Sequence, residues 1–274
     1  MNPRIKALGH RVFDVGFKAK VAAGKALGLI DFPVPPRHNL TTTSSNTVRH
    51  YFQSGLTTIQ PILMGAMAEG FEPDEDTHVL DFGCGVGRQL LHLKRWFPAM
   101  KISAIDVDRE VVDYVARTFP GVDAYCNDFD PPLKFADNSF DLIYSVSIFS
   151  HLSMDDAKLW LTDLARVAKP GSVLCLTFNS AHSLGIAHAD GRRLQFTQEQ
   201  LQGEGFILDG EEISEEAAAA EFFGKKARGI KRSYGETYYS HDKFGEVARS
   251  CGLTPLRMYP AVIDRHQDLA VFRA

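Results

Sequence analysis

Short apolar segments alternate with helical ones over residues 77–180, and this alternation constrains the fold more than any other feature. The apolar runs predict strands, and the apolar residues three and four positions apart between them predict helices. We expect strands at 78–82, 102–107, 122–126, 140–146 and 172–178, and helices at 86–97, 109–118 and 155–168. Strands that are connected through helices lie parallel, because the helix returns the chain to the starting edge of the sheet, and such crossovers are right-handed. The sequence therefore predicts an α/β fold in which helices cover both faces of a parallel sheet.

The segments before and after this alternation differ from it. A helix is expected at 59–67, with Pro61 in its first turn, where proline is tolerated. Residues 181–240 are rich in glycine and charge, and within them residues 214–221 have the serine cap and acidic first turn of a helix. The chain then continues with an expected helix at 241–251 and two last strands, at 254–259 and 268–272.

We expect an N-terminal helical extension over residues 1–70 and one domain over residues 71–274 that contains the 181–240 insertion. Residues 1–30 carry six Lys or Arg residues against one Asp, and their apolar residues have helical spacing. Two interpretations of this basic block are open. It is either a helix packed on the main domain with a solvated basic face, or a surface that meets an anionic membrane or a lipid-linked substrate.

Composition excludes several classes of protein. The formal net charge of −4 argues against a general nucleic-acid binder, which would carry a basic excess. The four cysteines form no C-x-x-C pair, so neither a zinc site nor a disulfide framework is expected. No apolar run approaches the about 18 residues of a membrane helix, and no secretory signal is visible. We therefore expect a soluble, cytoplasmic protein without an integral membrane segment.

A glycine-rich loop follows the first strand of the alternation, in the stretch VLDFGCGVGR at residues 79–88. Its glycines, Gly83, Gly85 and Gly87, permit a tight turn and a close approach of the backbone to a ligand. The spacing is G-x-G-x-G, whereas a loop for a pyrophosphate reads G-x-G-x-x-G. Asp81 stands two residues before the first glycine, where it suits an ammonium group and repels a phosphate.

Further polar residues follow the next strands. Asp106 ends the second strand, 25 residues after Asp81, where an acid binds both hydroxyls of a ribose. Asp128 follows the third strand and can accept a hydrogen bond from an adenine amino group, while Phe129 covers the ring. Ser145 lies at the end of the fourth strand, beside the glycine loop. This order of residues is typical of a site for an adenosine-containing ligand.

Five motifs in order, VLDFGCGVGR, AIDVD, CNDFD, FDLIYSVSIFSHL and LARVAKPGSVLCLTF, resemble the class I S-adenosylmethionine-dependent methyltransferases over residues 77–180. The Pro-Pro linker at 35–36, the segment FQSG at 52–55 and the ending HQDL are similar to bacterial methyltransferases that accompany polysaccharide or glycosyl-transfer genes, which implies a small-molecule or glycan acceptor. The resemblance implies a Rossmann-like, doubly wound sheet of seven strands, mostly parallel, with an antiparallel last strand. It also implies S-adenosylmethionine as the cofactor.

The resemblance assigns roles to individual residues. It implies that Asp81 and the backbone of Gly83, Cys84 and Gly85 hold the methionine part of the cofactor, and that Arg88 reaches its carboxylate. Asp106 would bind the ribose, and the adenine would lie against Val107, Asp128 and Phe129, with Ser145 completing the set.

The acceptor side is less defined by the sequence. Residues 234–241, 149–151 and 266–268 are aromatic and polar, and the fold would bring them together near the reacting methyl group. A histidine near neutral pKa is the natural base for a hydroxyl acceptor, so we predict His151 first and His266 second as catalytic residues. His241 is read as a helix-terminal residue. Asp155 and Asp156 are read as helix-capping acids, and no metal is expected.

These features predict an O-methyltransferase whose acceptor is a hydroxyl of a small molecule, sugar or glycan. Two alternatives stay open: a methyltransferase for a lipid-linked or macromolecular acceptor, with peripheral membrane contact through residues 1–30, or an S-adenosylmethionine-binding protein without catalysis. The N-P-P-[YF] motif is absent, which argues against methylation of nucleic-acid bases.

Overall fold

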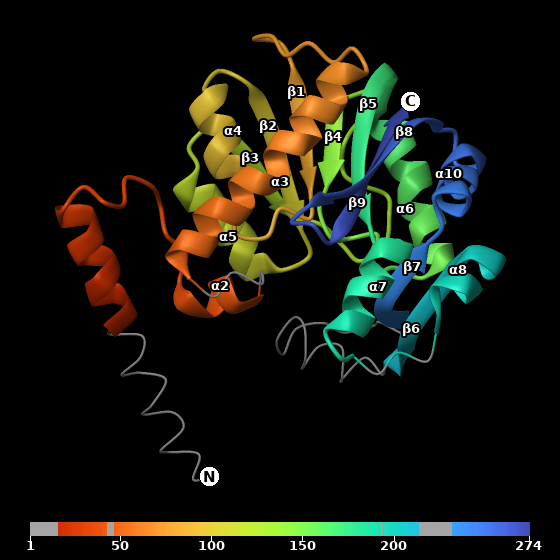
Figure 1. Ribbon diagram of the computed structural model, residues 1–274. Helices are drawn as coiled ribbons and strands as arrows, with labels where there is room; N and C mark the ends of the chain where they lie inside the picture. Colours follow the sequence, from red (N-terminus) through yellow and green to blue (C-terminus); the bar gives the residue numbers. More distant parts are fainter. Residues whose placement is uncertain (1–15, 43–46, 193, 195, 214–231) are drawn as a thin grey trace.

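A seven-stranded sheet forms the centre of the molecule in the computed structural model, with strand order β3-β2-β1-β4-β5-β9-β8 (Figure 1). The structure describes residues 16–42, 47–192, 194, 196–213 and 232–274. The strands are β1 (His78–Phe82), β2 (Lys101–Asp106), β3 (Val122–Cys126), β4 (Phe140–Ser145), β5 (Ala168–Phe178), β8 (Thr254–Ile263) and β9 (Gln267–Arg273). Strands β1 to β5 run parallel, and β9 is antiparallel to both neighbours. The predicted α/β sheet with an antiparallel last strand is confirmed.

Helices cover both faces of this sheet (Figure 1). One face carries α3 (Val48–Ala68), α4 (Leu90–Trp96) and α5 (Arg109–Thr118), and the other carries α6 (Met154–Val167) and α10 (His241–Ser250). Successive residues of a strand point to opposite faces. In β1, Val79 therefore packs into the apolar core under α3, while Leu80 packs into the core under α6. Because strands β1 to β5 run parallel, they all end at one edge of the sheet, which we call the carboxyl edge.

Helix α3 is longer than the sequence predicted. It begins at Val48 instead of residue 59, so Pro61 lies inside the helix and not in its first turn. The start is capped by Thr47, whose side chain accepts a hydrogen bond from the N–H of His50. Burial of one apolar face against the sheet, by residues such as Ile59 and Ile62, outweighs the backbone bond that Pro61 removes.

Two other boundaries differ from the prediction. Helix α4 begins at Leu90 instead of residue 86, because residues 83–89 form the turns of the glycine loop. Strand β5 begins at Ala168 instead of residue 172, directly after α6. A bulge in its pairing with β4, between Phe140 and Leu142, absorbs the extra residues.

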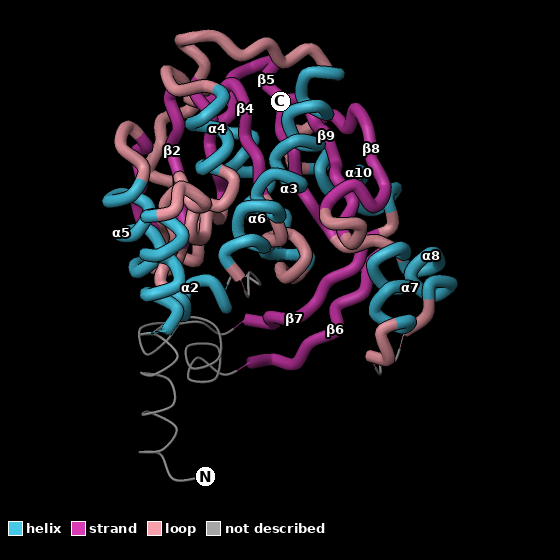
Figure 2. The backbone as a smooth tube through the Cα atoms, turned by 60° about the vertical axis from the view of Figure 1, so that its left-hand side comes forward, coloured by secondary structure: helices cyan, strands magenta, loops and turns pink. Residues whose placement is uncertain are grey.

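A small lobe, formed by residues 181–213 and 232–240, lies at the carboxyl edge (Figures 1 and 2). It contains α7 (Ala181–Ala189), α8 (Gln198–Glu204) and a two-stranded antiparallel sheet of β6 (Phe206–Ile213) and β7 (Arg232–Tyr239). Strand β7 attaches to the main sheet: the N–H of Thr237 donates to the Ser150 carbonyl, and that of Tyr239 to the Asn179 carbonyl, each at 2.8 Å. The sequence did not predict these two strands. The helix expected at 214–221 lies outside the described residues.

The described part of the N-terminal block is helical over residues 16–26 and is followed by α2 (Arg37–Thr42). Phe17 packs against the core, whereas Lys18, Lys20 and Lys25 are exposed. Both interpretations of the basic block remain open, and the division of the chain at residue 70 stays a prediction. Among the described residues, no helix is long and apolar enough to cross a membrane.

Candidate functional site

The glycine loop turns sharply at the carboxyl edge, between β1 and α4. The N–H groups of Gly83 and Cys84 both donate to the carbonyl of Ile105, each at 2.9 Å, which anchors the loop to the end of β2. Gly83 has φ of 84°, in the left-handed region that favours glycine. A Cβ on Gly83 would also lie 2.4 Å from the side chain of Ile148, which follows β4. The loop is therefore shaped by the two strands beside it.

Asp106 faces this loop from the end of β2. One carboxylate oxygen, Oδ2, accepts the N–H of Gly85 at 2.9 Å, and the other accepts the N–H of Asp108 at the same distance. Burial raises the pKa of Asp106, although these backbone donors oppose the rise. The carboxylate is thus held in one orientation beside the loop, with lone pairs left for hydroxyl donors.

Asp81 lies at the base of the loop, on β1, with 2% of its surface exposed. Its Oδ2 atom has no hydrogen-bond partner among the described residues. Burial, with the nearby charge of Asp106, raises the pKa of Asp81 to about 7, although Tyr144 and Arg88 oppose the rise. A buried carboxylate oxygen without a partner is costly, so this position fits a ligand that carries a cation.

Arg88 lies on the other side of the loop, below α3. Its Nη1 donates to Ser54 Oγ at 3.4 Å, and burial lowers its pKa against the favourable charges of Asp264 and Asp81. Asp264 belongs to the turn between β8 and β9 and accepts a hydrogen bond from Thr57 on α3, at 2.6 Å. Helix α3 and this turn therefore meet above the glycine loop.

The other predicted cofactor residues lie along the same edge. The Val107 carbonyl accepts from Cys126 Sγ at 3.2 Å, and the N–H of Asn127 donates to the Asp106 carbonyl at 3.1 Å, so the ends of β2 and β3 are held together. Asp128 is exposed and Phe129 is half-buried. Cys84 and Ser145 are buried, and Ser145 Oγ has no partner among the described residues. Every predicted cofactor residue thus lies at or beside the carboxyl edge.

His151 follows β4 and contacts the small lobe. Its Nδ1 lies 3.0 Å from the carbonyl oxygen of Gly235 on β7. A carbonyl only accepts hydrogen bonds, so Nδ1 carries the ring proton and Nε2 is the acceptor nitrogen of the neutral ring. Burial lowers the pKa of His151, although Gly235 and Glu236 oppose this. The ring is therefore neutral at pH 7 and able to take a proton.

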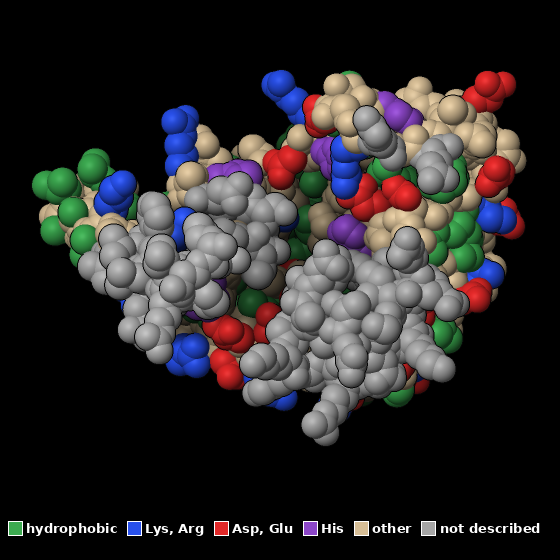
Figure 3. Space-filling model, turned by 90° about the horizontal axis from the view of Figure 1, so that it is seen from below, with side chains coloured by type: hydrophobic (Ala, Val, Ile, Leu, Met, Phe, Trp, Pro, Cys, Tyr) green, Lys and Arg blue, Asp and Glu red, His purple; other side chains and the backbone are tan. Residues whose placement is uncertain are grey.

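His266 lies in the turn between β8 and β9, and burial lowers its pKa as well. The charge of Glu236, on β7, acts on both His151 and His266 and raises the pKa of each. Sequence reasoning named the stretch around Glu236 but did not single out this residue. The view onto the carboxyl edge shows several histidine side chains among acidic and basic ones (Figure 3).

His241 forms an ion pair that the sequence did not predict. Its Nε2 lies 2.5 Å from Oδ2 of the buried Asp268, and this bond raises the pKa of His241 in spite of burial. Asp268 therefore orients His241 and not the adjacent His266. The preceding residue, Gln267, points to the other face, where its Oε1 accepts from Ser147 Oγ at 2.9 Å and Thr177 Oγ1 at 3.1 Å. Successive residues of a strand point to opposite faces, so the sequence could have predicted that Gln267 and Asp268 have different partners.

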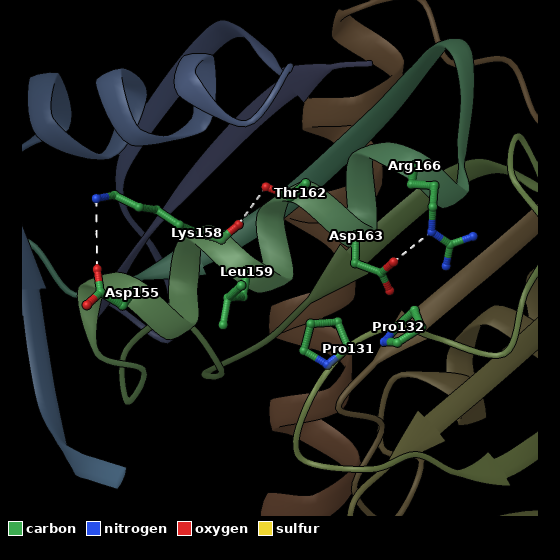
Figure 4. A pocket seen from close by; sticks show the side chains of 8 residues that line it. All are labelled: Pro131, Pro132, Asp155, Lys158, Leu159, Thr162, Asp163 and Arg166. Carbon is green, nitrogen blue, oxygen red and sulfur yellow. Dashed lines mark hydrogen bonds and ion pairs between the residues drawn. The ribbon is translucent and has the colours of Figure 1, made fainter.

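Two other features lie apart from this edge cluster. Ser153 caps α6 by accepting the N–H of Asp156 at 3.2 Å, so the acids after it occupy the first turn of a helix. A cavity of about 550 Å³ separates α6 from the loop after β3, and Pro131, Pro132 and Leu159 face one another across it (Figure 4). None of the predicted site residues lines that cavity.

Comparison with known proteins agrees with this geometry. Residues 79–171 match the methyltransferase domain family. An O-methyltransferase of Aspergillus sclerotiorum is 29% identical over 183 residues, which cover 58% of this chain and 66% of that protein. An O-methyltransferase of Aspergillus nomiae is 33% identical over 103 residues, 36% of this chain and 44% of that protein. The chain thus spans less than two thirds of either relative.

A solved S-adenosylmethionine-dependent methyltransferase of Methanosarcina mazei has the same fold. It superposes with a TM-score of 0.51 at 16% identity, over 78% of this chain and 96% of the other. The strand order and this superposition show that the chain has the class I fold of S-adenosylmethionine-dependent methyltransferases, and residues 79–171 within it match the methyltransferase domain family.

Proposed function

We propose that this protein transfers a methyl group to a hydroxyl of a small-molecule or sugar acceptor, with His151 as the base. The observation that carries the proposal is the bond between His151 Nδ1 and the Gly235 carbonyl. This bond leaves Nε2 of the neutral ring as the atom that can accept a proton. His151 lies in the segment that follows β4 and contacts the glycine loop through Ile148. That the similar Aspergillus proteins are named O-methyltransferases supports a hydroxyl acceptor.

The residues of the carboxyl edge would hold the cofactor. S-Adenosylmethionine, when bound, supplies a methyl group on a sulfonium sulfur that departs as a neutral thioether. Asp81 would bind the ammonium group with its unpartnered oxygen, and Asp106 would accept hydrogen bonds from the ribose hydroxyls. Arg88 would bind the methionine carboxylate. Val107, Asp128 and Phe129 would line the adenine.

The protein's remaining task is to align the acceptor and remove its proton. Nε2 of His151 would take the hydroxyl proton as the oxygen attacks, and the bond from Nδ1–H to Gly235 would keep the ring in place meanwhile. His266 is the second choice for this role. The charge of Arg192 lowers the pKa of His266, but two nitrogens of this arginine are already bound to Glu236, so its charge is already paired within the protein. The site therefore favours a neutral hydroxyl over a carboxylate acceptor.

A lipid-linked acceptor is a second candidate, because of the exposed residues after the 16–26 helix. Leu27 and Leu29 are 73% and 75% exposed, beside the exposed Lys25. Apolar and basic side chains together are typical of a surface that binds anionic lipid.

The test is methyl transfer from labelled S-adenosylmethionine to pools of acceptors: phenols, sugars, glycans, lipid-linked sugars and carboxylic acids. We expect label in a hydroxyl pool, and His151→Ala should lower kcat about 10²- to 10⁴-fold with cofactor affinity unchanged. His188→Ala is the matched control, because this exposed histidine also bonds a backbone carbonyl, that of Leu184 at 2.9 Å. Label only in carboxylic acids, or no label in any pool, would refute the proposal.

A further inference from the structure

We infer that Ser147 is a positioning residue: a hydrogen-bond network holds its backbone in a left-handed conformation, and this conformation directs the segment that carries His151. Ser147 lies two residues after the end of β4, and residues 147–151 lead from there to the small lobe. That His151 acts in catalysis rests on the function proposed above. The conformation of Ser147 can be measured without cofactor or acceptor.

Ser147 has a backbone conformation that serine rarely adopts. Its φ is 60°, in the left-handed region, where a Cβ atom crowds the backbone. A residue with a Cβ stays in this region only where the surrounding structure holds it there, and such positions cluster at active sites. Ser147 therefore needs partners that fix its backbone.

Polar side chains at the carboxyl edge supply these partners. The N–H of Ser147 donates to Thr177 Oγ1, near the end of β5, at 2.8 Å, and its hydroxyl donates to Gln267 Oε1, at the start of β9, at 2.9 Å. Thr177 Oγ1 donates to the same Oε1 at 3.1 Å, and Gln267 Nε2 donates to Asn179 Oδ1 at 3.1 Å. Thr177, Asn179 and Gln267 are buried. Because each donor meets an acceptor away from water, the network holds both the backbone and the side chain of Ser147.

The residues after Ser147 contact first the glycine loop and then the small lobe. Ile148 packs so closely against Gly83 that an added Cβ there would lie 2.4 Å from the Ile148 side chain. The Ile148 carbonyl accepts the N–H of His151 at 3.0 Å, and the His151 ring bonds the Gly235 carbonyl. The conformation of Ser147 therefore sets the direction of a segment that contacts the glycine loop and ends at the proposed base.

The first test compares two substitutions of Ser147. Ser147→Ala removes the hydroxyl bond to Gln267 but keeps the crowded Cβ, whereas Ser147→Gly removes both the bond and the crowding. If the bond serves to hold a left-handed backbone, glycine does not need it. We therefore expect Ser147→Ala to disturb residues 147–151 and Ser147→Gly to resemble the wild type. Asn138→Gly is the matched control, because Asn138 has φ of 56° before β4, at the opposite edge of the sheet.

Two measurements on the protein alone report the disturbance. Hydrogen exchange of the His151 amide follows the turn that its bond to Ile148 closes, and nitrogen NMR of the His151 ring shows which ring nitrogen carries the proton. In Ser147→Ala we expect exchange about 2- to 10-fold faster, as for the loss of one hydrogen bond, and a smaller share of protons on Nδ1. Ser147→Gly and Asn138→Gly should leave both unchanged.

A second pair of variants tests the bond from the Ser147 backbone. Thr177→Val removes the hydroxyl that accepts the N–H of Ser147, and Thr177→Ser keeps it. We expect the His151 amide to exchange faster in Thr177→Val and at the wild-type rate in Thr177→Ser. Equal rates in the two variants would show that the hydroxyl of Thr177 does not hold Ser147.

The last test is kcat with an acceptor found in the labelling experiment. Ser147→Ala should lower kcat about 10- to 100-fold, as for a misplaced reacting group, and Ser147→Gly should restore most of the loss. The inference would be overturned if Ser147→Ala left the exchange and the ring spectrum unchanged, or if Ser147→Gly disturbed them equally. A disturbed ring with an unchanged kcat would overturn the part of Ser147 in catalysis. A disturbance in Ser147→Ala that glycine removes, without methyl transfer by any variant or the wild type, would support the role of Ser147 and overturn the proposed function alone.

Discussion

The environment of the Asp81 carboxylate favours a bound ligand. The carboxylate is buried, one oxygen has no partner among the described residues, and its pKa is raised to about 7. Leaving such a group unpaired costs on the order of 1–3 kcal/mol, more when it is charged. A cationic group on a ligand would pair with the carboxylate and remove that cost. Binding of such a ligand is therefore coupled to the ionisation of Asp81.

Cofactor affinity should therefore rise with pH below neutrality. Only the ionised carboxylate attracts an ammonium group, and Asp81 gains its proton as the pH falls through about 7. Between pH 7 and pH 5.5 we expect calorimetric affinity to fall by up to about tenfold per pH unit. Asp81→Asn should bind weakly with a flat profile. A wild-type affinity that does not change over this range would contradict the role of Asp81.

The pair His241–Asp268 should stabilise the fold in a pH-dependent way. The bond to Asp268 raises the folded-state pKa of His241, so its contribution is fully present below the unfolded value of about 6.5 and is lost as the pH rises through the folded value. Since 39% of the His241 side chain is exposed, solvent screening limits the effect to about 1 kcal/mol.

Urea unfolding of wild type and His241→Asn between pH 5 and pH 9 tests this. The difference in the free energy of unfolding should be largest near pH 5–6 and shrink toward pH 9. A difference that grows with pH would contradict a raised pKa of His241 in the folded state.

Sequence alone was informative for residues next to strand ends and uninformative for pairs made across the fold. Asp81 and Asp106 were found because each lies at the end of an apolar run. The partner of His241 was not found, because residues 27 positions apart meet only once the sheet is formed. Glu236 was missed for the same reason: Arg192 reaches it from a turn 44 positions away.

The glycine loop is packed closely against the segment that follows β4. Gly83 has φ of 84° and leaves room for Ile148, whereas Gly171, at the opposite edge, has φ of 83° and would have nothing within 4 Å of an added Cβ. Alanine at either position adopts the same strained backbone, which costs about 1–2 kcal/mol.

Both Gly83→Ala and Gly171→Ala should therefore lose stability, Gly83→Ala more because its methyl group also meets Ile148, and the two should differ in binding. We expect Gly83→Ala to weaken S-adenosylmethionine binding at least about tenfold, because the added methyl group displaces Ile148 and the loop. Gly171→Ala should bind as the wild type does. Thermal unfolding and calorimetry measure the two effects separately, and equal affinities would argue against a rigid loop.

Element boundaries were predictable where apolar runs and breakers coincide. Strand β3 and helix α5 lie where the sequence placed them, because Pro120 and Gly121 separate them. Helix α3 was predicted too short, since its first turns are polar and are helical because Thr47 caps them and the later turns pack on the sheet. Strands β6 and β7 were not predicted, because their alternation is interrupted by glycine and acidic residues.

For the whole molecule, the alternation of strands and helices was enough to predict the layered fold. It was not enough to place the small lobe, whose position depends on backbone bonds from β7 to Ser150 and Asn179. Those bonds place the lobe at the carboxyl edge, beside His151 and His266. The residues proposed to bind the cofactor thus follow strand ends that the local sequence predicts, whereas the position of those proposed for the acceptor depends on how the lobe packs.

We expect the glycine loop and its acids to bind S-adenosylmethionine, and calorimetric titration measures this binding. The wild type should bind one equivalent with a Kd in the micromolar range, about −8 kcal/mol. Asp106→Ala should weaken binding about 10- to 150-fold through the loss of hydrogen bonds to a charged group. Asp113→Ala, an exposed acid on α5, should leave it unchanged. Binding of NAD without any binding of S-adenosylmethionine or its demethylated product would show that the glycine loop is not a site for this cofactor.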